Sequence, residues 1–297
     1  MYYLGIDGGG TRTTAAVSDE KGNILYKSVG KTINFYSVGF DVSRNNLKEI
    51  MNDINRQFPE IFFESAFIGC SALDNEATEE TISALCKGVI NANKIGMNSD
   101  VYVALKSVDT NKPHCVAICG TGSMAVGEKE NGETVVKGGW GHIIGDEGSA
   151  YSIAVQTLKK CCLETDRCKL HRIVTVANKY FGVHYFRDII DIIYSPETSK
   201  DIIAGFASEV AKAAEGGVTE CEKIIVGEAK AFADTVLSLL REIENCDLLS
   251  LYGGVFQHNL LFRKTFMQVI LNYYPELKIE MLDNTPEDGA LKIARKL

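Results

Sequence analysis

The stretch that decides the fold lies near the start of the chain, where residues 3–17 read YLGIDGGGTRTTAAV. An apolar run that enters a cluster of glycines and leaves it as a second apolar run is typical of two β-strands joined by a tight hairpin. A turn at Lys21-Gly22-Asn23 and a β-rich run from Ile24 to Tyr26 follow directly. The segment therefore predicts an antiparallel meander of three strands.

A second copy of this pattern occurs later in the chain. Residues 116–126 read VAICGTGSMAV, and a turn at Glu130-Asn131-Gly132 leads into another β-rich run over 134–136. Gly120 and Gly132 follow Gly10 and Gly22 at the same spacing of 110 positions. Self-similarity of this kind predicts a duplicated architecture with two related domains, although two unrelated glycine-rich hairpins would give a similar pattern.

Helical patterns separate and follow the two meanders. Their apolar positions repeat at helical spacing over residues 47–58, 82–90, 149–163 and 221–244, and a short buried strand is expected over 248–252. Sheets covered by helices, given twice, indicate an α/β fold. We expect domains over 1–112 and 113–285, with a terminal helix over 286–297 that packs on the first domain.

Composition restricts the partners and the compartment. The 297 residues are 45% hydrophobic and carry a formal net charge of -8, which argues against nucleic acid or an anionic membrane as the main partner. The N-terminus lacks the pattern of a secretory signal, and no apolar run is long enough for a membrane span. The nine cysteines are odd in number and include no Cys-x-x-Cys pair, so we expect reduced thiols and a cytoplasmic protein. A homodimer is compatible with the sequence, which does not decide the oligomeric state.

Both hairpins have the composition of phosphate-binding loops. Gly8-Gly9-Gly10-Thr11 with Thr13, and Gly120-Thr121-Gly122-Ser123, combine exposed backbone N–H groups with hydroxyl donors. Neither is a Walker loop or a dinucleotide fingerprint, because each leads into a strand. Asp7, at the mouth of the first hairpin, could hold a hydrated Mg²⁺ ion against the phosphates of ATP, or could only satisfy its own turn.

Residues 138–149, which read GGWGHIIGDEGS, form the most unusual segment of the chain. They combine dense glycine with the only tryptophan and two acids, which is typical of a loop that faces a ligand. Alternatively, Trp140 could lie in the core, and Asp146 or Glu147 could stabilise the start of the next helix. We take Asp146 as a site residue and leave the role of His142 open.

The ordered set of motifs resembles one known family over nearly the whole chain. The group comprises N-acetylglucosamine kinases and BadF/BadG/BcrA/BcrD-type ATPases, within the actin, hexokinase and Hsp70 superfamily. The resemblance implies a duplicated two-domain actin-like ATPase (ribonuclease H-like) fold with a central nucleotide cleft. It also implies an ATP- and Mg²⁺-dependent kinase that phosphorylates a hydroxyl of an amino sugar, most simply N-acetylglucosamine or N-acetylmuramic acid.

Binding residues follow from the same resemblance. Gly253-Gly254 matches the strand end that contacts adenosine, and Asn34 and Ser71 match positions that line the amino-sugar pocket. The loop that contains Trp140 and Gly141 matches another part of that pocket.

The resemblance also implies that Asp100 is the catalytic base, in a family pattern that reads Asn-Asp-x-x-x-Ala-Leu. Ser99 replaces the usual asparagine, and residues 101–103 are β-prone where the family begins a helix. Asp74 and Asp109 are the alternative bases if the motif is misaligned.

Two other functions are compatible with parts of the pattern. One is the ATPase that activates 2-hydroxyacyl-CoA dehydratases, which needs paired cysteines for an iron–sulfur cluster. Cys119 precedes Gly120, but no matching cysteine motif follows. The other is a non-catalytic ATP-binding sensor, against which the candidate sugar and base residues argue.

Overall fold

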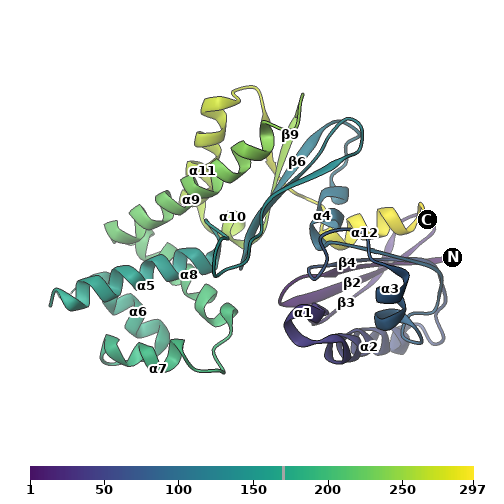
Figure 1. Cartoon of the computed structure of the whole chain (residues 1–297), viewed down its shortest axis with the longest axis horizontal. Helices are drawn as coiled ribbons and strands as arrows, with labels where there is room; N and C mark the ends of the chain where they lie inside the picture. Colours follow the sequence, from purple (N-terminus) through teal and green to yellow (C-terminus); the bar gives the residue numbers. More distant parts are fainter. Residues whose placement is uncertain (169–170) are drawn as a thin grey trace. The chain divides into compact units, whose positions relative to one another are not determined.

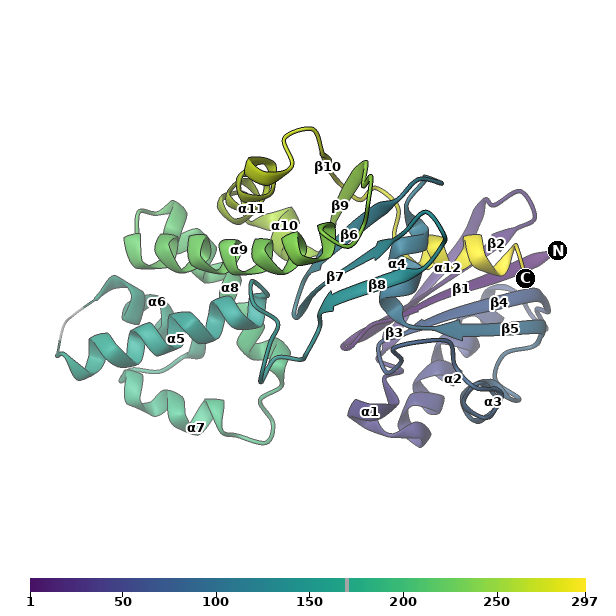
Figure 2. The ribbon, with the colours of Figure 1, turned by 45° about the horizontal axis from the view of Figure 1, so that its top comes forward.

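The structure is a computed structural model, and it describes residues 1–168 and 171–297. The chain divides into two compact units, each drawn in Figures 1 and 2. Unit 1 comprises Met1–Asn111 and Leu282–Leu297, and unit 2 comprises Lys112–Met281. Each unit contains one five-stranded sheet, which confirms the predicted duplicated α/β fold.

The sheet of unit 1 has the order β3-β2-β1-β4-β5. Its strands are β1 (Tyr2–Gly8), β2 (Arg12–Asp19), β3 (Ile24–Lys31), β4 (Phe63–Cys70) and β5 (Ala92–Asn98). The first three strands form the predicted antiparallel meander, while β4 lies parallel to β1 and β5 lies parallel to β4. The carboxyl ends of β1 and β4 are therefore neighbours at one edge of the sheet.

The sheet of unit 2 repeats this topology in the order β10-β9-β6-β7-β8. Its strands are β6 (His114–Cys119), β7 (Ser123–Glu128), β8 (Thr134–Gly138), β9 (Leu248–Tyr252) and β10 (Lys278–Met281). Strands β6, β7 and β8 form the second meander, and β9 lies parallel to both β6 and β10. Strands β6 and β9 thus correspond to β1 and β4.

Helices cover both faces of the first sheet. They are α1 (Phe35–Val38), α2 (Phe40–Gln57), α3 (Glu79–Cys86), α4 (Asp100–Ser107) and α12 (Pro286–Ala294). Figure 1 shows α12 on one face of the strands and α2 on the other. The apolar side of α2, including Leu47, Ile50 and Ile54, is buried in the core of the unit.

Unit 2 contains more helix. Its helical segments are α5 (Ala150–Asp166), α6 (Arg172–Phe181), the 3₁₀ turn η1 (Phe186–Asp188), α7 (Ile189–Ile193), α8 (Lys200–Glu215), α9 (Thr219–Leu240), α10 (Gly254–His258) and α11 (Leu260–Tyr273). Helices α5, α8 and α9 lie alongside one another, and α9 also packs on β7 and α11 (Figure 2). Among the helices described, none is long and apolar enough to cross a bilayer.

Two predicted helices end earlier than their apolar patterns. Helix α3 ends at Cys86, where Lys87 and Gly88 leave the helical conformation, although the pattern continues to residue 90. Helix α9 ends at Leu240 instead of residue 244. In both cases apolar residues beyond the helix end, such as Ile90 and Ile243, are still buried. The apolar pattern therefore continues after the backbone has left the helical conformation.

Helix α4 forms despite its β-prone sequence. Val101 and Val103 are buried, and packing of these side chains outweighs the weak local preference for a strand. Ser99 caps the helix, because its side-chain oxygen accepts a hydrogen bond from the backbone N–H of Tyr102. A serine therefore provides the helix start at the position where the family pattern has asparagine.

Glycines allow α12 to approach α4 and β1 at backbone distance. A Cβ atom at Gly289 of α12 would lie 1.9 Å from the carbonyl oxygen of Val103. A Cβ atom at Gly5 of β1 would lie 2.6 Å from the carbonyl oxygen of Glu287 and 2.6 Å from the backbone nitrogen of Leu291. A side chain at Gly289 would push α12 away from α4, and a side chain at Gly5 would push α12 away from β1.

We expect Gly289→Ala to destabilise the protein, although alanine is the better helix former by about 0.5–1 kcal/mol. The methyl group has no space against the backbone of α4, and overpacking of this kind typically costs about 1–3 kcal/mol. Urea unfolding of purified variants would measure the change. The matched control is Gly227→Ala in α9, where nothing lies within 4 Å of the added Cβ, so stability should stay equal or rise. A Gly289→Ala protein as stable as the control would contradict the close packing.

Candidate active site

A cluster of three carboxylates lies at the carboxyl edge of the first sheet. Asp7 is the last residue but one of strand β1, Asp100 is the first residue of α4, and Glu287 is in the first turn of α12. Burial raises the pKa of Asp7 to about 8, and repulsion from Asp100 and Glu287 adds to the effect, while Arg12 opposes it. Asp7 therefore favours the protonated form at neutral pH unless a cation compensates the charge.

Each member of this cluster is fixed by its own contacts. The backbone of Asp100 packs on Gly69 of β4, where a Cβ atom would lie 3.2 Å from the Cα atom of Asp100. Glu287 is buried, and its Oε1 accepts a hydrogen bond from Nζ of Lys27 at 2.9 Å. Glu287 was not predicted as a site residue, because its approach to Asp7 depends on the packing of α12. Its only local signal is its place beside Pro286 at a helix start.

Magnesium is compatible with this cluster. Mg²⁺ prefers oxygen ligands and usually binds through one or two carboxylates, with water and phosphate oxygens as the other ligands. Asp7 and its acidic neighbours supply oxygen donors whose mutual repulsion a cation would relieve. Among residues 1–168 and 171–297, no group of three or more side chains forms a ready-made metal site. The protein would thus hold the ion with few ligands of its own.

The alternative bases lie in different environments. Asp109 accepts a hydrogen bond from Nδ2 of Asn284 at 2.9 Å and pairs with Lys292, and these hydrogen bonds lower its pKa. A carboxylate with a lowered pKa is a weaker proton acceptor. Asp74 is exposed in the segment after β4.

The first hairpin is braced by the segment that follows β3. The hydroxyl of Thr32 donates to the carbonyl oxygen of Gly9 at 2.8 Å, and Oγ1 of Thr13 accepts from the backbone N–H of Ile33 at 3.2 Å. Thr13 is fully buried, so in this structure its hydroxyl supports the hairpin from inside. Gly10 and Thr11 form the bend itself, and Thr11 is exposed.

Asn34 and Ser71 lie together beside this hairpin. Nδ2 of Asn34 donates to Oγ of Ser71 at 3.0 Å, and the backbone N–H of Ser71 donates to the carbonyl oxygen of Gly8 at 2.8 Å. Oδ1 of Asn34 accepts from the backbone N–H groups of Tyr36 and Ser37, which caps α1. The amide keeps one N–H, and the serine keeps its O–H, for a ligand.

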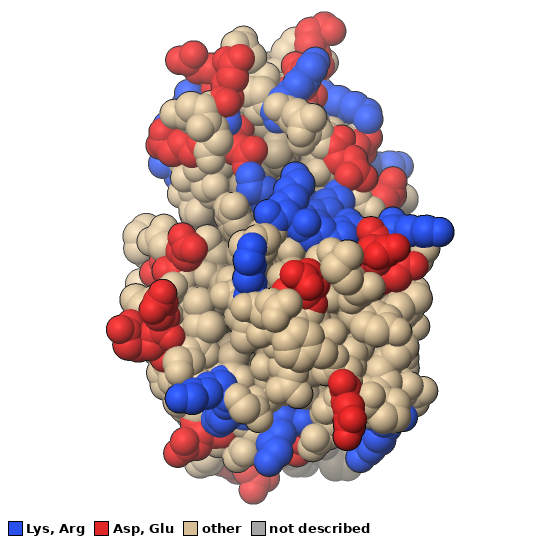
Figure 3. Space-filling view, turned by 90° about the vertical axis from the view of Figure 1, so that its right-hand side faces the viewer, with Lys and Arg blue, Asp and Glu red and all other residues tan. Residues whose placement is uncertain are grey.

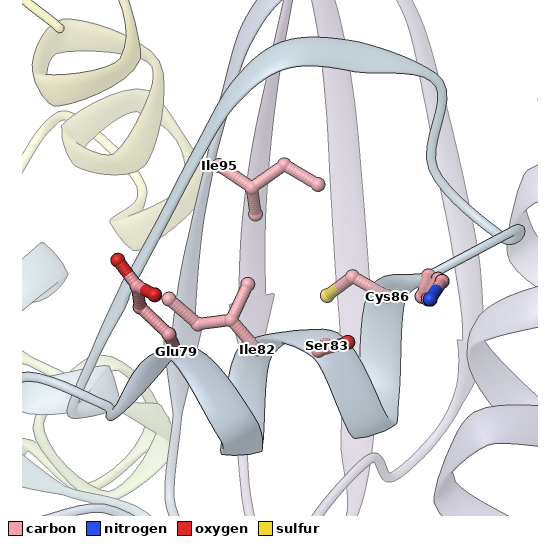
Figure 4. Close-up of a pocket in the computed structure, with 6 residues that line it drawn as sticks. Glu79, Ile82, Ser83, Cys86 and Ile95 are labelled. Atoms are coloured by element: carbon pink, nitrogen blue, oxygen red, sulfur yellow. The ribbon is translucent and has the colours of Figure 1, made fainter.

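A separate pocket of unit 1 lies between α3 and β5, away from these residues (Figure 4). It is lined by Glu79, Ile82, Ser83, Cys86, Lys87 and Ile95. None of the predicted site residues is among them. The carboxylate cluster is thus not part of this pocket.

In unit 2, the second hairpin is joined by hydrogen bonds to the loop over 138–149. The backbone N–H of Ala150 donates to the carbonyl oxygen of Gly120 at 2.9 Å, and Oγ of Ser123 donates to the carbonyl oxygen of Glu147 at 2.7 Å. The backbone N–H of Gly139 donates to the carbonyl oxygen of Ser123 at 3.2 Å. Hairpin and loop therefore form one hydrogen-bonded assembly.

Asp146 lies at the centre of this assembly. A Cβ atom at Gly122 would lie 2.8 Å from its Oδ2, and its backbone has the left-handed φ of 62°. Burial raises the pKa of Asp146, while hydrogen bonds from the backbone of Gly141 and Ser123 and the charge of Lys200 oppose the effect. The carboxylate thus connects the loop to the hairpin, and does not merely stabilise the start of α5, which Ser149 caps.

The tip of the loop is exposed and apolar. Trp140, Ile143 and Ile144 are 75%, 85% and 78% exposed, so the alternative that Trp140 is a core residue is wrong. His142 packs edge-on against the ring of Tyr151, with the centroids 4.8 Å apart. Large apolar side chains in solvent at a glycine-rich loop suit contact with a ligand.

The end of β9 lies against the start of the second hairpin. Gly253 has a φ of 109°, and a Cβ atom there would lie 2.3 Å from the carbonyl oxygen of Cys119. Only glycine allows this approach, and Gly254 then begins α10. Gly253 and the hairpin are therefore direct neighbours within unit 2.

Thr121 of the second hairpin contacts Asp201, which no sequence motif indicated. Its Oγ1 donates to Oδ1 of Asp201 at 3.2 Å, at the start of α8. Lys200, the preceding residue, is close enough to influence the pKa of Asp146. A half-buried lysine beside a candidate phosphate loop is a favourable neighbour for anionic groups.

The face of the molecule in Figure 3 has a mixed charge. Acidic and basic side chains are interspersed there, with one group of lysine and arginine side chains near the middle. Over the described residues on this face, no broad surface has the uniform positive charge that suits a nucleic-acid backbone.

Comparisons with known proteins agree with the resemblance found in the motifs. A kinase from Clostridium acetobutylicum, named N-acetylmuramic acid/N-acetylglucosamine kinase, is 26% identical, over 99% of this chain and 98% of its own. An N-acetyl-D-glucosamine kinase of Dictyostelium discoideum is also 26% identical, over 98% of this chain and 97% of its own.

A crystal structure from Chromobacterium violaceum, described as a candidate N-acetylglucosamine kinase, has a TM-score of 0.80. It is 18% identical and covers 98% of both chains, so it supports the fold. The sequence profile of the BadF/BadG/BcrA/BcrD ATPase family matches residues 4–291. One conclusion follows from the two matching hairpins, the strand ends beside them and this match over almost the whole length. The chain belongs to the BadF/BadG/BcrA/BcrD ATPase family.

Proposed function

We propose that this protein is an ATP-dependent kinase that transfers the γ-phosphoryl group to a hydroxyl of N-acetylglucosamine or N-acetylmuramic acid. The observation that carries the proposal is the grouping of Asp7, Asp100, Asn34 and Ser71 at one sheet edge. A candidate base, a candidate metal ligand and two sugar-binding donors are thus neighbours within unit 1. The names of the curated relatives support an amino sugar as the acceptor.

Asp100 acts as the general base in this proposal. Its carboxylate accepts the proton of the sugar hydroxyl while the γ-phosphoryl group is transferred. The N-terminal position in α4 and the contact with Gly69 hold its backbone in place. Because phosphoryl transfer depends mainly on positioning and charge neutralisation, a base on a rigid helix start is well suited to the step.

Asp7 contributes to charge neutralisation. When bound, Mg²⁺ would neutralise phosphate charge, and Asp7 is the residue that we assign to it. Without a cation, burial and the repulsion of Asp100 and Glu287 favour protonated Asp7. Burial, reinforced by this repulsion, thus makes the ionised form of Asp7 favourable only when positive charge is present.

Each unit, taken by itself, contains residues that suit recognition of a sugar. The remaining N–H of Asn34 and the hydroxyl of Ser71 donate hydrogen bonds to sugar oxygens. The loop over 138–149 provides the exposed ring of Trp140, the backbone of Gly141 and the carboxylate of Asp146. An aromatic ring with adjacent polar groups suits a substituent that has both a methyl group and an amide.

ATP binding is assigned to the glycine-rich elements. The hairpins at Gly8 to Thr11 and Gly120 to Ser123 bind phosphates through their N–H and O–H groups, and Gly253-Gly254 contacts adenosine. Space beside Gly120 is open, since nothing lies within 4 Å of an added Cβ. Contacts within the protein therefore do not explain this glycine, whereas close approach of a phosphate does.

The surroundings of Cys119 do not favour the dehydratase activator. Cys119 is fully buried, its Sγ donates to the carbonyl oxygen of Gly148 at 3.2 Å, and burial raises its pKa well above the ordinary value. Iron–sulfur clusters bind thiolates, which burial of this kind disfavours. We also place the protein in the cytoplasm, where ATP is abundant and where its free thiols would stay reduced.

An ADP-release assay over a panel of sugars tests the proposal. We expect turnover of N-acetylglucosamine or N-acetylmuramic acid to exceed that of glucose by roughly 10-fold or more, because loss of one matched polar contact costs about 1.4 kcal/mol or more. The assay is run with and without Mg²⁺. Glucose turned over equally well would reject the amino-sugar preference, and ATP binding without any phosphorylated sugar would favour the sensor function.

Asp100→Asn should separate catalysis from binding. The amide keeps the shape of the side chain but is not a base, so kcat should fall by about 10²–10⁴-fold, with little change in the KM of either substrate. Asp74→Asn and Asp109→Asn are the controls and should stay near wild type. Near-normal turnover by folded Asp100→Asn, or a large loss in either control, would assign the base elsewhere.

Asp7→Asn should raise stability in a pH-dependent way. The folded protein holds a proton on Asp7 up to about pH 8, while the unfolded chain loses it near 3.8, so wild type loses stability as pH rises between these values. The variant has no such ionisation and does not lose stability in this way. Its melting temperature, measured without Mg²⁺, should therefore exceed that of wild type by an amount that grows from pH 4 to pH 8. Activity should fall and need more Mg²⁺. An advantage that is constant over this range would contradict the raised pKa.

A further inference from the structure

Glu228 lies in the middle of α9 and is buried, with 9% of its surface exposed. Its Oε2 accepts a hydrogen bond from the backbone N–H of Gly148 at 2.7 Å. Burial of a carboxylate is costly unless hydrogen bonds or opposite charges compensate it. A carboxylate in this position therefore needs an explanation beyond the packing of a helix.

Gly148, which donates this hydrogen bond, lies near the end of the loop over 138–149. Gly148 has a φ of 82°, and a Cβ atom there would lie 2.6 Å from Cβ of Phe232 and 3.1 Å from the carbonyl oxygen of Glu228. Its own carbonyl oxygen accepts the hydrogen bond from Sγ of Cys119. The N–H of Gly148 is thus fixed by α9, and its C=O is fixed by the last residue of β6.

This double attachment lies beside groups that we assign to the substrates. Asp146 is two residues before Gly148, and Cys119 directly precedes the hairpin at Gly120. Glu147, which lies between Asp146 and Gly148, is also attached to the hairpin, because its carbonyl oxygen accepts a hydrogen bond from Oγ of Ser123. A displacement of Gly148 would therefore shift Asp146 relative to the hairpin.

We propose that Glu228 is a positioning residue that holds the end of the 138–149 loop, and with it Asp146, in the geometry that binds the sugar. The proposal rests on the sugar-binding role given above to that loop. Glu228 does not itself touch the substrate; it acts through the N–H of Gly148. Without the carboxylate, that buried N–H would lose its hydrogen bond, and a loop with left-handed glycines at 138, 139 and 141 has other conformations open to it.

The kinetic test compares three substitutions at one position. Glu228→Gln keeps an oxygen acceptor at the same reach, Glu228→Asp keeps the charge but is one methylene shorter, and Glu228→Ala removes the acceptor. We expect Glu228→Ala and Glu228→Asp to raise the KM for N-acetylglucosamine roughly 10-fold, with the KM for ATP changed less than about 3-fold, because the buried N–H of Gly148 would lose its hydrogen bond. Glu228→Gln should keep near-wild-type values. Glu222→Ala, at an exposed acid of the same helix, is the matched control.

Two kinetic results would overturn the proposal. If Glu228→Gln is as defective as Glu228→Ala, the charge matters and the hydrogen bond to Gly148 does not. If both KM values rise equally, or only the melting temperature falls, Glu228 has a general structural role. Should Glu228→Ala fail to fold, the comparison of Glu228→Asp with Glu228→Gln gives the same decision.

Hydrogen–deuterium exchange gives a readout that does not depend on catalysis. Peptides covering residues 138–151 should exchange faster in Glu228→Ala and Glu228→Asp than in wild type, Glu228→Gln or the Glu222→Ala control. Unchanged exchange in Glu228→Ala and Glu228→Asp would overturn the positioning role, whatever the kinetics. If wild type phosphorylates no amino sugar, the proposed function fails, while the exchange result still decides whether Glu228 holds the loop.

Discussion

Direct backbone packing of α4 and α12 on the first sheet is the constraint on which the candidate site depends. Gly5 and Gly69 bring the strands close to α12 and α4, and Gly289 brings α12 close to α4. The helix starts are therefore brought to the carboxyl ends of β1 and β4, and Asp100 and Glu287 lie close to Asp7. Larger residues at these glycines would separate the helices from the strands, and the acidic cluster would be lost without any change in the acids themselves.

In unit 2, hydrogen bonds bring the candidate binding groups together. The second hairpin and the 138–149 loop share bonds at Gly120, Ser123 and Gly139, and Asp146 adds a side-chain connection between them. Groups assigned to phosphate and to sugar are thus parts of one rigid assembly. Phosphoryl transfer depends on positioning more than on covalent chemistry, so rigidity in these elements is directly useful for the proposed reaction.

The sequence predicted the parts of the molecule that are encoded locally. Glycine-rich turns between apolar runs identified both meanders, and the repeat identified the duplication, because strand alternation and turn chemistry are short-range signals. The helix at Asp100 was predicted only through the family resemblance, since its local β preference is opposed by burial of Val101 and Val103. Residues such as Glu228 and Glu287 gave no usable signal, because their roles arise from contacts with residues 80 or more positions away.

Burial of Asp7, together with repulsion from its acidic neighbours, links stability to function. A carboxylate with a pKa near 8 lowers the stability of the free protein at neutral pH and above, so its retention there is not explained by folding. Such unfavourable groups are typical of functional sites, where the ligand supplies the missing interaction. Positive charge beside Asp7 would stabilise its ionised form and would offset the repulsion from Asp100 and Glu287. The same acids that lower the stability of the free protein would therefore strengthen binding of a cation, and the close packing at Gly5, Gly69 and Gly289 holds them together despite their repulsion.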